Sequence, residues 1–229
     1  MRIVLSRDRG RASVDLAPGP LGAGGILLVL FGLLTVLVGQ RRLEPVDLGL
    51  MPRVQAVSGP TLDVLAGLLN YAAAAEVALA VGCLASVALL RSGVALPAGA
   101  APLVFLLALP IELALKYTVE QPAPAEWFYR KTLAYGLLTL PTMQSYPSGH
   151  VLRAAFIAVL GGYLAWRLLP SARMLMVWGG LGVFVLLCAW CRVYQGQHWP
   201  TDVVGGALLG GAAGCLAVAV LGPSLPART

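Results

Sequence analysis

The stretch GAGGILLVLFGLLTVLVG, residues 22 to 39, contains no charged side chain and is long enough to cross a lipid bilayer as a helix. A hydrocarbon core of about 30 Å requires about 20 apolar residues per helix. A secretory signal would end in a small-residue cleavage site of the A-x-A kind, and no such site follows this run. We therefore expect a retained span, preceded by an Arg-rich cytoplasmic tail.

Similar apolar runs recur along the rest of the chain, at about residues 65–90, 101–119, 149–169, 174–191 and 202–221. The 229-residue chain is 59% hydrophobic and only 11% charged, with a mean hydropathy of +0.83. These values exclude an ordinary soluble domain. Since a backbone in lipid must satisfy its own hydrogen bonds, the spans have to be helices. The sequence thus predicts an all-α, integral membrane bundle of six transmembrane helices.

The runs fill most of the chain, so we expect one six-span domain over residues 22–222, flanked by tails at 1–21 and 223–229. Between the third and fourth spans, residues 125–143 are rich in aromatic side chains and include Arg130 and Lys131. This composition favours a short helix lying in the membrane interface.

The net charge of +6 comes mainly from Arg residues near the ends of the spans. Such charges set the orientation of a membrane protein and favour anionic lipid. Their distribution favours a cytoplasmic N-terminus, which places both termini in the cytoplasm. No base-reading motif accompanies the basic residues, so we expect no nucleic-acid partner.

The four cysteines all lie in apolar runs, and Cys188 and Cys191 have C-x-x-C spacing. This spacing can indicate redox chemistry or a metal site. No strand-helix redox context surrounds the pair, so we interpret it as small residues packing inside a span.

Two polar islands hold the only histidines of the chain. His150 lies in YPSGH at the start of the fourth span, and His198 lies in CRVYQGQHWPTD, residues 191–202, before the sixth. Lys116 closes the third span on the same predicted face of the membrane. Ionisable groups at membrane depth are costly, which makes them candidates for function.

The residue types in these islands are suited to phosphate chemistry. Lys116 and Arg192 supply fixed positive charge for phosphate oxygens. Ser148 and Gly149 offer a hydroxyl and backbone N–H groups where a helix begins, which is an anion-binding arrangement.

The histidines provide a nucleophile and an acid. If a helix begins near Trp199 or Pro200, Asp202 lies one turn along it and can hold the His198 imidazole in one tautomer. The other ring nitrogen is then a nucleophile. His150 could protonate the leaving oxygen and later activate water. Together these groups are equipped for phosphoryl transfer through a phosphohistidine, with no metal and no cofactor.

The islands resemble the three signatures of the type 2 phosphatidic acid phosphatase family, which includes membrane lipid phosphatases and soluble vanadium haloperoxidases. Pro147, Ser148, Gly149 and His150 match the second signature, P-S-G-H. The third signature is S-R, five residues, H, three residues, D, and residues 191–202 match it with Cys in place of Ser. The first is K, six residues, R-P, and residues 116–124 keep its Lys and Pro.

One departure from the family pattern affects phosphate binding. Ala123 stands where the first signature has Arg, and this departure puts one phosphate contact in doubt. Arg153, one turn after His150, is a candidate replacement. Alternatives are Arg130 or Lys131 from the interfacial segment, or Ser148 with backbone N–H groups alone.

The resemblance implies roles for these residues. His198 would be the nucleophile, Asp202 its orienting group and His150 the acid and base. The phosphate would be bound by a further set: Lys116, Ser148, Gly149, Arg192 and, in this chain, Arg153.

The resemblance also implies an activity. The enzyme would be a metal-independent lipid phosphatase, a hydrolase of isoprenyl or glycerolipid phosphates or pyrophosphates. Its site would face the non-cytoplasmic side of a bacterial inner membrane. Two alternatives stay open: a lipid phosphotransferase that uses the same phosphoenzyme, and a lipid-binding or transport subunit with a degenerate site. A haloperoxidase is disfavoured because the chain is membrane-embedded.

Other polar residues in the spans have ordinary structural interpretations. Glu112 is four residues before Lys116 and can hold its side chain. Glu76 and Asn70 in the second span need partners between helices.

Overall fold

The structure is a computed structural model, and it describes residues 16–130 and 144–225. Within these residues there is no β-strand, so the all-α prediction is confirmed. The α-helices are α1 (Pro18–Gly39), α2 (Glu44–Gln55), α3 (Pro60–Ala72), α4 (Ala75–Arg91), α5 (Leu96–Gly99), α6 (Leu109–Thr118), α7 (Gly149–Leu168), α8 (Ser171–Tyr194) and α9 (Pro200–Leu221). Three short 3-10 helices are η1 (Ala101–Ala108), η2 (Glu126–Phe128) and η3 (Gly222–Ser224).

Five helical segments of the described chain are long and apolar enough to cross a membrane: α1, η1 with α6, α7, α8, and α9 with η3. The number becomes six if the bent pair α3 and α4 counts as one span. The chain is therefore a multi-pass integral membrane protein of the predicted six-span kind.

The second expected span is not one straight helix, which corrects the sequence prediction. The chain bends by 44° between α3 and α4. At the break the backbone carbonyl of Ala73 accepts a hydrogen bond of 3.1 Å from Nε of Arg153 on α7. A run of alanines has a high helix propensity, so the sequence favours a continuous helix. The contact with Arg153 satisfies a carbonyl that the break leaves without its helical partner.

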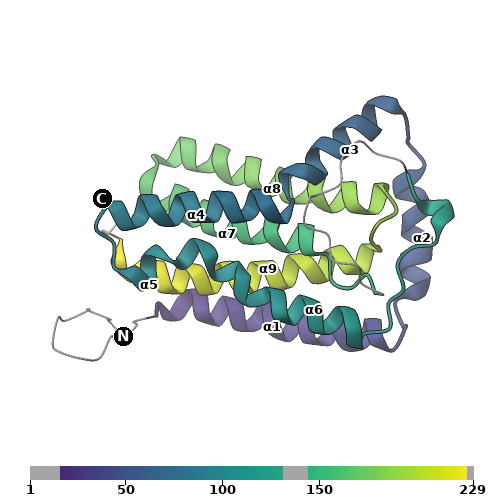
Figure 1. Cartoon of the computed structure of the whole chain (residues 1–229), viewed down its shortest axis with the longest axis horizontal. Coiled ribbons are helices and arrows are strands. Elements are labelled where there is room, and N and C mark those ends of the chain that lie inside the picture. The colour runs from purple at the N-terminus through teal and green to yellow at the C-terminus, as the bar shows by residue number, and fades with distance from the viewer. Residues whose placement is uncertain (1–15, 131–143, 226–229) are drawn as a thin grey trace.

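The polar segment after the first span contains a helix that the sequence analysis did not predict. α2 turns Asp47 and Met51, four residues apart, toward the bundle, and both are buried. Met51 packs in a cluster with Val151 of α7 and Val203 of α9. This contact fixes α2 across the end of the bundle (Figure 1).

Helix α9 lies at the centre of the bundle and packs against α1 and α7. Gly206 and Gly210 of α9 lie directly against the backbone of α7, at the carbonyls of Ser148 and Leu152. Small residues four apart allow two helix backbones to approach closely in a membrane. This approach brings the N-terminal turns of α7 and α9 together.

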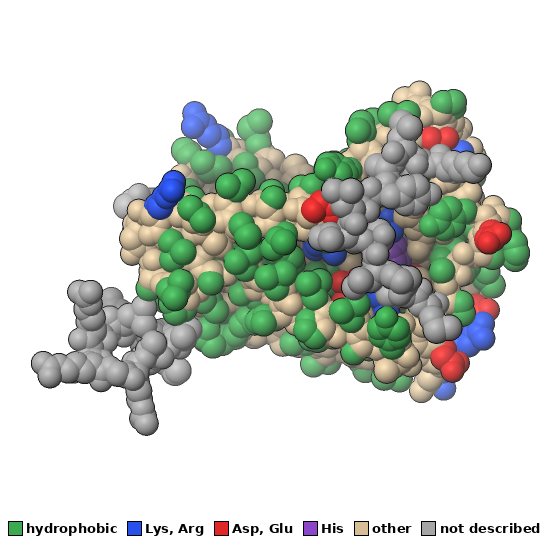
Figure 2. Space-filling view, viewed as in Figure 1, with side chains coloured by type: hydrophobic (Ala, Val, Ile, Leu, Met, Phe, Trp, Pro, Cys, Tyr) green, Lys and Arg blue, Asp and Glu red, His purple; other side chains and the backbone are tan. Residues whose placement is uncertain are grey.

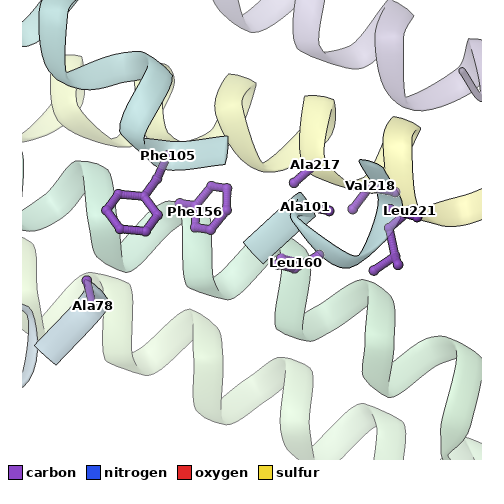
Figure 3. Packing of buried hydrophobic residues seen from close by; sticks show 9 residues of the cluster. Ala78, Ala101, Phe105, Phe156, Leu160, Ala217, Val218 and Leu221 are labelled. Atoms are coloured by element: carbon purple, nitrogen blue, oxygen red, sulfur yellow. The ribbon is translucent and has the colours of Figure 1, made fainter. Parts of the chain in front are cut away.

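The largest buried apolar cluster joins α4, η1, α7 and α9 (Figure 3). Phe105 and Phe156 meet with their ring centroids 5.4 Å apart. Farther along the same cluster, Leu160 lies against Ala217 and Leu221. In this part of the bundle the helices are therefore held together by interlocking apolar side chains.

The two ends of the bundle differ. The first and last spans begin and end side by side, where the backbone N–H of Ala17 donates to the carbonyl of Ala219 (3.1 Å). α2 and α3 lie at the opposite end. In the view of Figure 2 apolar side chains cover the length of the bundle, while histidine and several charged side chains gather near α2, α3 and α6. The predictions for residues 1–15, 131–143 and 226–229, including Lys131 and most of the interfacial helix, lie outside the described residues.

Candidate active site

The three signature segments meet at the α2–α3 end of the bundle. Lys116 lies in the last turn of α6, His150 in the first turn of α7, and Arg192 in the last turn of α8. His198 lies in the short loop between α8 and α9, and Asp202 lies in the first turn of α9. The structure therefore brings together side chains that are up to 86 residues apart in the sequence.

His198 is held by Asp202. Nδ1 of the imidazole lies 3.2 Å from Oδ2 of the carboxylate. The same Oδ2 accepts the backbone N–H of Trp199 (2.9 Å), which forms the capping box at the start of α9. Since the ring uses Nδ1 for this contact, Nε2 is the nitrogen left for chemistry.

The loop between α8 and α9 aims His198 into the bundle. Gly196 has a positive φ of 69°, and a side chain there would collide with the backbone of Phe128. The N–H groups of Gln197 and His198 both donate to the carbonyl of Arg192, at 3.1 and 3.2 Å. This tight turn places the imidazole close to Arg192, six residues earlier in the chain.

The P-S-G-H segment is joined to α9 through its backbone. The N–H of Ser148 donates to the carbonyl of Asp202 (2.9 Å). Oγ of Ser148, Nε2 of His150 and Nε of Arg192 are buried and have no hydrogen-bond partner among the described residues. Buried donors and acceptors normally have partners, so these atoms are available for a ligand with oxygen atoms.

Arg192 is anchored by α3. One of its terminal nitrogens donates to Oδ1 of Asn70. Its neighbour Cys191 donates its thiol to the carbonyl of Ala66, also on α3 (2.9 Å). The Cys at the position of the family Ser is thus a packing contact, in line with the structural interpretation of this cysteine, and its thiol does not face the cluster of histidines.

Lys116 reaches toward the same centre. Its Nζ lies 3.4 Å from the carbonyl of Ser145, and the side chain is 8% exposed. The carboxylate of Glu112 lies directly against Cα of Gly149, where any larger residue would collide with it. Glu112 therefore lies in the site, between α6 and the start of α7, as well as near Lys116.

Arg153 is also part of this cluster, although one of its nitrogens is hydrogen-bonded to the backbone between α3 and α4. Its Nε donates to Ala73, as described above, and its charge acts on Glu112, His150 and His198. Arg130, the alternative candidate, is elsewhere. It pairs with Asp63 (3.0 Å) and stacks over the ring of Tyr194.

The surroundings of His198 oppose its protonation. Burial lowers the pKa of this imidazole well below its ordinary value, and the charges of Arg192 and Lys116 lower it further. The ring is 6% exposed. A neutral imidazole is the form that can act as a nucleophile.

No group of three or more His, Cys, Asp or Glu side chains among the described residues is arranged to hold a metal ion. Asp202 is engaged with His198, and Glu112 faces Gly149. Besides these two carboxylates, the cluster contains the cations Lys116 and Arg192, the hydroxyl of Ser148 and two imidazoles, and these groups are suited to binding an anion.

Sequence reasoning missed two residues at this site. Asn70 had no assigned role but holds Arg192. Asp47 was not singled out at all, yet it is 2% exposed and hydrogen-bonded to Thr201 next to Asp202. The one available sequence signal for Asp47 was an acidic residue among apolar neighbours in residues 43–51. That signal did not indicate which residue Asp47 would contact.

Comparison with known proteins places these residues in a family. A family model of the PAP2 superfamily matches residues 97–224, which include all three signatures. The putative undecaprenyl-diphosphatase YbjG of Escherichia coli is 32% identical over 115 residues, covering 50% of this chain and 54% of that protein. Undecaprenyl-diphosphatase of Sulfolobus acidocaldarius is 37% identical over 107 residues, 46% of each chain. Phosphatidylglycerophosphatase B of Bacillus subtilis is 37% identical over 87 residues, 37% of this chain and 43% of that one.

The chain thus spans about half the length of the curated relatives it matches. Solved structures extend the likeness over most of the fold. The transmembrane PAP2-type phosphatidylglycerolphosphate phosphatase of Bacillus subtilis has a TM-score of 0.70 and 23% identity, covering 85% of this chain and 93% of that one. LpxE of Aquifex aeolicus has a TM-score of 0.55 and 24% identity, covering 75% and 93%. With the family model matching more than half of its residues, this chain belongs to the PAP2 superfamily.

Proposed function

We propose that this protein is a membrane lipid phosphatase that hydrolyses an isoprenyl or glycerolipid phosphate or pyrophosphate through a phosphohistidine. One observation carries the proposal: His198 is held by Asp202 and buried in a cluster with Lys116 and Arg192. A neutral nucleophile surrounded by cations is suited to attack on an anionic phosphorus centre. The related proteins with phosphatase names support the same reaction class.

The first half-reaction forms a nitrogen–phosphorus bond. Nε2 of His198 attacks phosphorus, and the bond from phosphorus to the lipid-side oxygen breaks. Asp202 stabilises the positive imidazole through Nδ1–H. His150, in its protonated form, gives its proton to the leaving oxygen. Lys116, Arg192 and Ser148, together with backbone N–H groups at the start of α7, balance the charge that develops on the phosphoryl oxygens.

The second half-reaction regenerates the enzyme. Neutral His150 takes a proton from water, whose oxygen attacks the phosphohistidine. The nitrogen–phosphorus bond breaks, inorganic phosphate leaves, and His198 returns to its neutral form. No step requires a metal ion, and we expect full activity in chelator.

The site also has to admit a lipid. It lies at one end of the spans, so the phosphate can enter from the aqueous side while the hydrocarbon chain stays in the bilayer. We place this end on the non-cytoplasmic side of a bacterial inner membrane, with the six-span unit at residues 22–222 forming the phosphatase domain.

The test is phosphate release by the purified protein in detergent with chelator present. The substrates are an isoprenyl pyrophosphate, phosphatidic acid and phosphatidylglycerophosphate. His198→Ala should abolish turnover. It should also abolish labelling of the enzyme by a substrate carrying ³²P in the transferred phosphoryl group, with the reaction stopped in alkaline detergent because phosphohistidine is hydrolysed in acid. Gln197→Ala, one residue away, is the matched control. Turnover at the wild-type rate by His198→Ala would remove the assignment of the nucleophile, and activity that returned only with Mg²⁺ would contradict the metal-free route.

Two other activities are separated by the same assay. A phosphotransferase would transfer label to an added lipid or sugar alcohol faster than to water. A binding or transport subunit would release no phosphate and acquire no label from any of the substrates.

A further inference from the structure

Asp47 is a buried carboxylate that lies outside the membrane spans. The proposed reaction assigns it no role. It lies on α2, one turn before Met51, on the face that packs against the bundle. Only 2% of its surface is exposed. A carboxylate buried to this degree is costly unless several donors satisfy it, so its partners show what it is for.

Those partners are the first turn of α9 and the segment after α6. Oδ1 accepts the backbone N–H of Thr201 (2.9 Å), and Oδ2 accepts its hydroxyl (2.6 Å). Oδ2 also accepts the side-chain amide of Gln121 (3.1 Å). Thr201 follows Pro200 at the start of α9, where backbone N–H groups have no partner within the helix. Asp47 supplies that partner and places negative charge at the positive end of α9.

Thr201 and Gln121 each connect Asp47 to groups of the active site, Thr201 to Asp202 and Gln121 to Lys116. Thr201 is adjacent to Asp202, the residue that holds His198. The carbonyl of Gln121 accepts the N–H and the hydroxyl of Ser145, at 2.8 and 3.1 Å. The carbonyl of Ser145 in turn lies 3.4 Å from Nζ of Lys116. One carboxylate thus joins the first signature segment to the third.

We propose that Asp47 is a positioning residue for the reaction: by clamping Thr201 and Gln121 it keeps Asp202 against the imidazole of His198 and so fixes the tautomer of the nucleophile. This inference rests on the proposed function for its kinetic consequences, but its structural consequence, the fixed tautomer, is measurable without turnover.

The helical hairpin formed by α2 and α3 offers a matched control. Asp63 of α3 accepts hydrogen bonds from Tyr194 (2.7 Å) and Arg130 (3.0 Å), and the first of these joins α3 to the end of α8. If the hairpin acts only as a structural cover, removal of either carboxylate should have the same effect. If Asp47 positions the nucleophile, only its own removal should affect the reacting groups.

The kinetic experiment compares Asp47→Ala, Asp47→Asn and Asp63→Ala. For Asp47→Ala we expect kcat to fall about 30- to 100-fold, the scale of a misplacement of roughly 1 Å. KM should stay within about threefold, because Asp47 reaches the phosphate-binding Lys116 only indirectly, through Gln121 and Ser145. Asn keeps an oxygen for the N–H of Thr201, so Asp47→Asn should recover most of kcat. Asp63→Ala should leave kcat close to that of the wild type.

The second experiment observes the imidazole directly. In His150→Asn protein His198 is the only histidine, so ¹⁵N-histidine NMR in detergent reports it alone. We expect a single tautomer with the proton on Nδ1 in this protein, and a mixture of tautomers after Asp47→Ala is added. If Asp47→Ala does not fold, Thr201→Val, which removes one of the three donors, takes its place and should show a smaller shift in the same direction.

The outcomes decide separately on the two proposals. Failure of the wild-type protein to release phosphate would end the proposed function, and the tautomer comparison would then decide on Asp47 alone. An unchanged tautomer in the Asp47→Ala protein would overturn the positioning role. An equal loss of kcat in Asp63→Ala would overturn it too, because that result would assign the loss to the hairpin as a whole.

Discussion

His198 is buried and lies close to the cations Arg192 and Lys116. Burial is the main cause of its lowered pKa, and Arg192 and Lys116 add to the effect. The ring therefore remains neutral at a pH where a histidine in water is already charged. Asp202 compensates by stabilising positive charge only when the ring has become phosphorylated.

This environment predicts an unusual titration. In His150→Asn protein, the NMR signal of His198 should not titrate near the ordinary pKa of about 6.5 and should shift only at lower pH. Because the pKa is depressed in the folded state, the associated stability is complete above about 6.5 and is lost as the pH falls toward the folded pKa. Unfolding experiments should therefore show a loss of stability below pH 6.5 that His198→Gln reduces. A midpoint at or above 6.5 for His198 would contradict the dry, cationic site.

Arg153 is our candidate for the phosphate contact that the first signature assigns to the position of Ala123. Arg153 is buried, with 6% of its surface exposed, and it lies among the site residues. Arg130 instead pairs with Asp63 near the surface. The bond from Nε of Arg153 to Ala73 also fixes the direction of the guanidinium. A guanidinium held through Nε still has two terminal nitrogens, which would be able to bind phosphate oxygens as a fork.

Arg153→Ala should therefore lower kcat/KM about 10- to 100-fold, the scale of one lost charge-assisted hydrogen bond. Arg130→Ala should have a much smaller effect. Thermal unfolding of each variant separates loss of the α3–α4 contact from loss of phosphate binding. Arg153→Lys is informative because it keeps the charge but removes the fork, and we expect it to recover only part of the activity. Equal, small effects at both positions would mean that the site uses two cations.

Residue-level chemistry was the part of the site most accessible from the sequence. His198 and Asp202 are four residues apart across a helix start, and this local spacing is enough to predict their contact. Asp47, in contrast, meets Thr201 across 154 residues of sequence. Such a contact depends on how α2 crosses the end of the bundle, which no local pattern specifies.

At the scale of the element, the packing of α9 against α7 sets the geometry of the site. The close approach at Gly206 and Gly210 brings Ser148 within 2.9 Å of the Asp202 carbonyl. The sequence predicted the spans from hydropathy, because that property depends on composition alone. It did not predict the bend between α3 and α4, where the side chain of Arg153, on another helix, contacts the carbonyl of Ala73.

Gly210→Ala tests this packing. The added methyl group would collide with the backbone carbonyl of Leu152, and backbone cannot move as a flexible side chain does. We expect a loss of stability of about 1–3 kcal/mol, typical of overpacking, together with reduced kcat as the two signature turns separate. Gly180→Ala on α8 is the control, since nothing lies within 4 Å of its added methyl group. Comparable thermal unfolding of the two variants would show that the close approach is not needed.

At the scale of the whole molecule, the bundle has two chemically distinct ends. Ala17 and Ala219 are joined at one end, while His198, Lys116 and Arg192 lie at the other. Because Ala17 and Ala219 lie at the same end, the chain between them crosses the membrane an even number of times. Six crossings result if the bent pair α3 and α4 counts as one. The site then lies on the side of the membrane opposite to Ala17 and Ala219.

Cysteine labelling tests this topology directly. Ser58, between α2 and α3, and Ser224, after α9, are both exposed and lie at opposite ends of the bundle. A membrane-impermeant maleimide applied to intact cells should label Ser58→Cys and should label Ser224→Cys only after the membrane is permeabilised. Unsubstituted protein controls for its four native cysteines. If both positions were labelled on intact cells, α3 and α4 would not form a single crossing. Labelling of Ser224→Cys alone would turn the site toward the cytoplasm, where it would meet lipid phosphates of the inner leaflet instead.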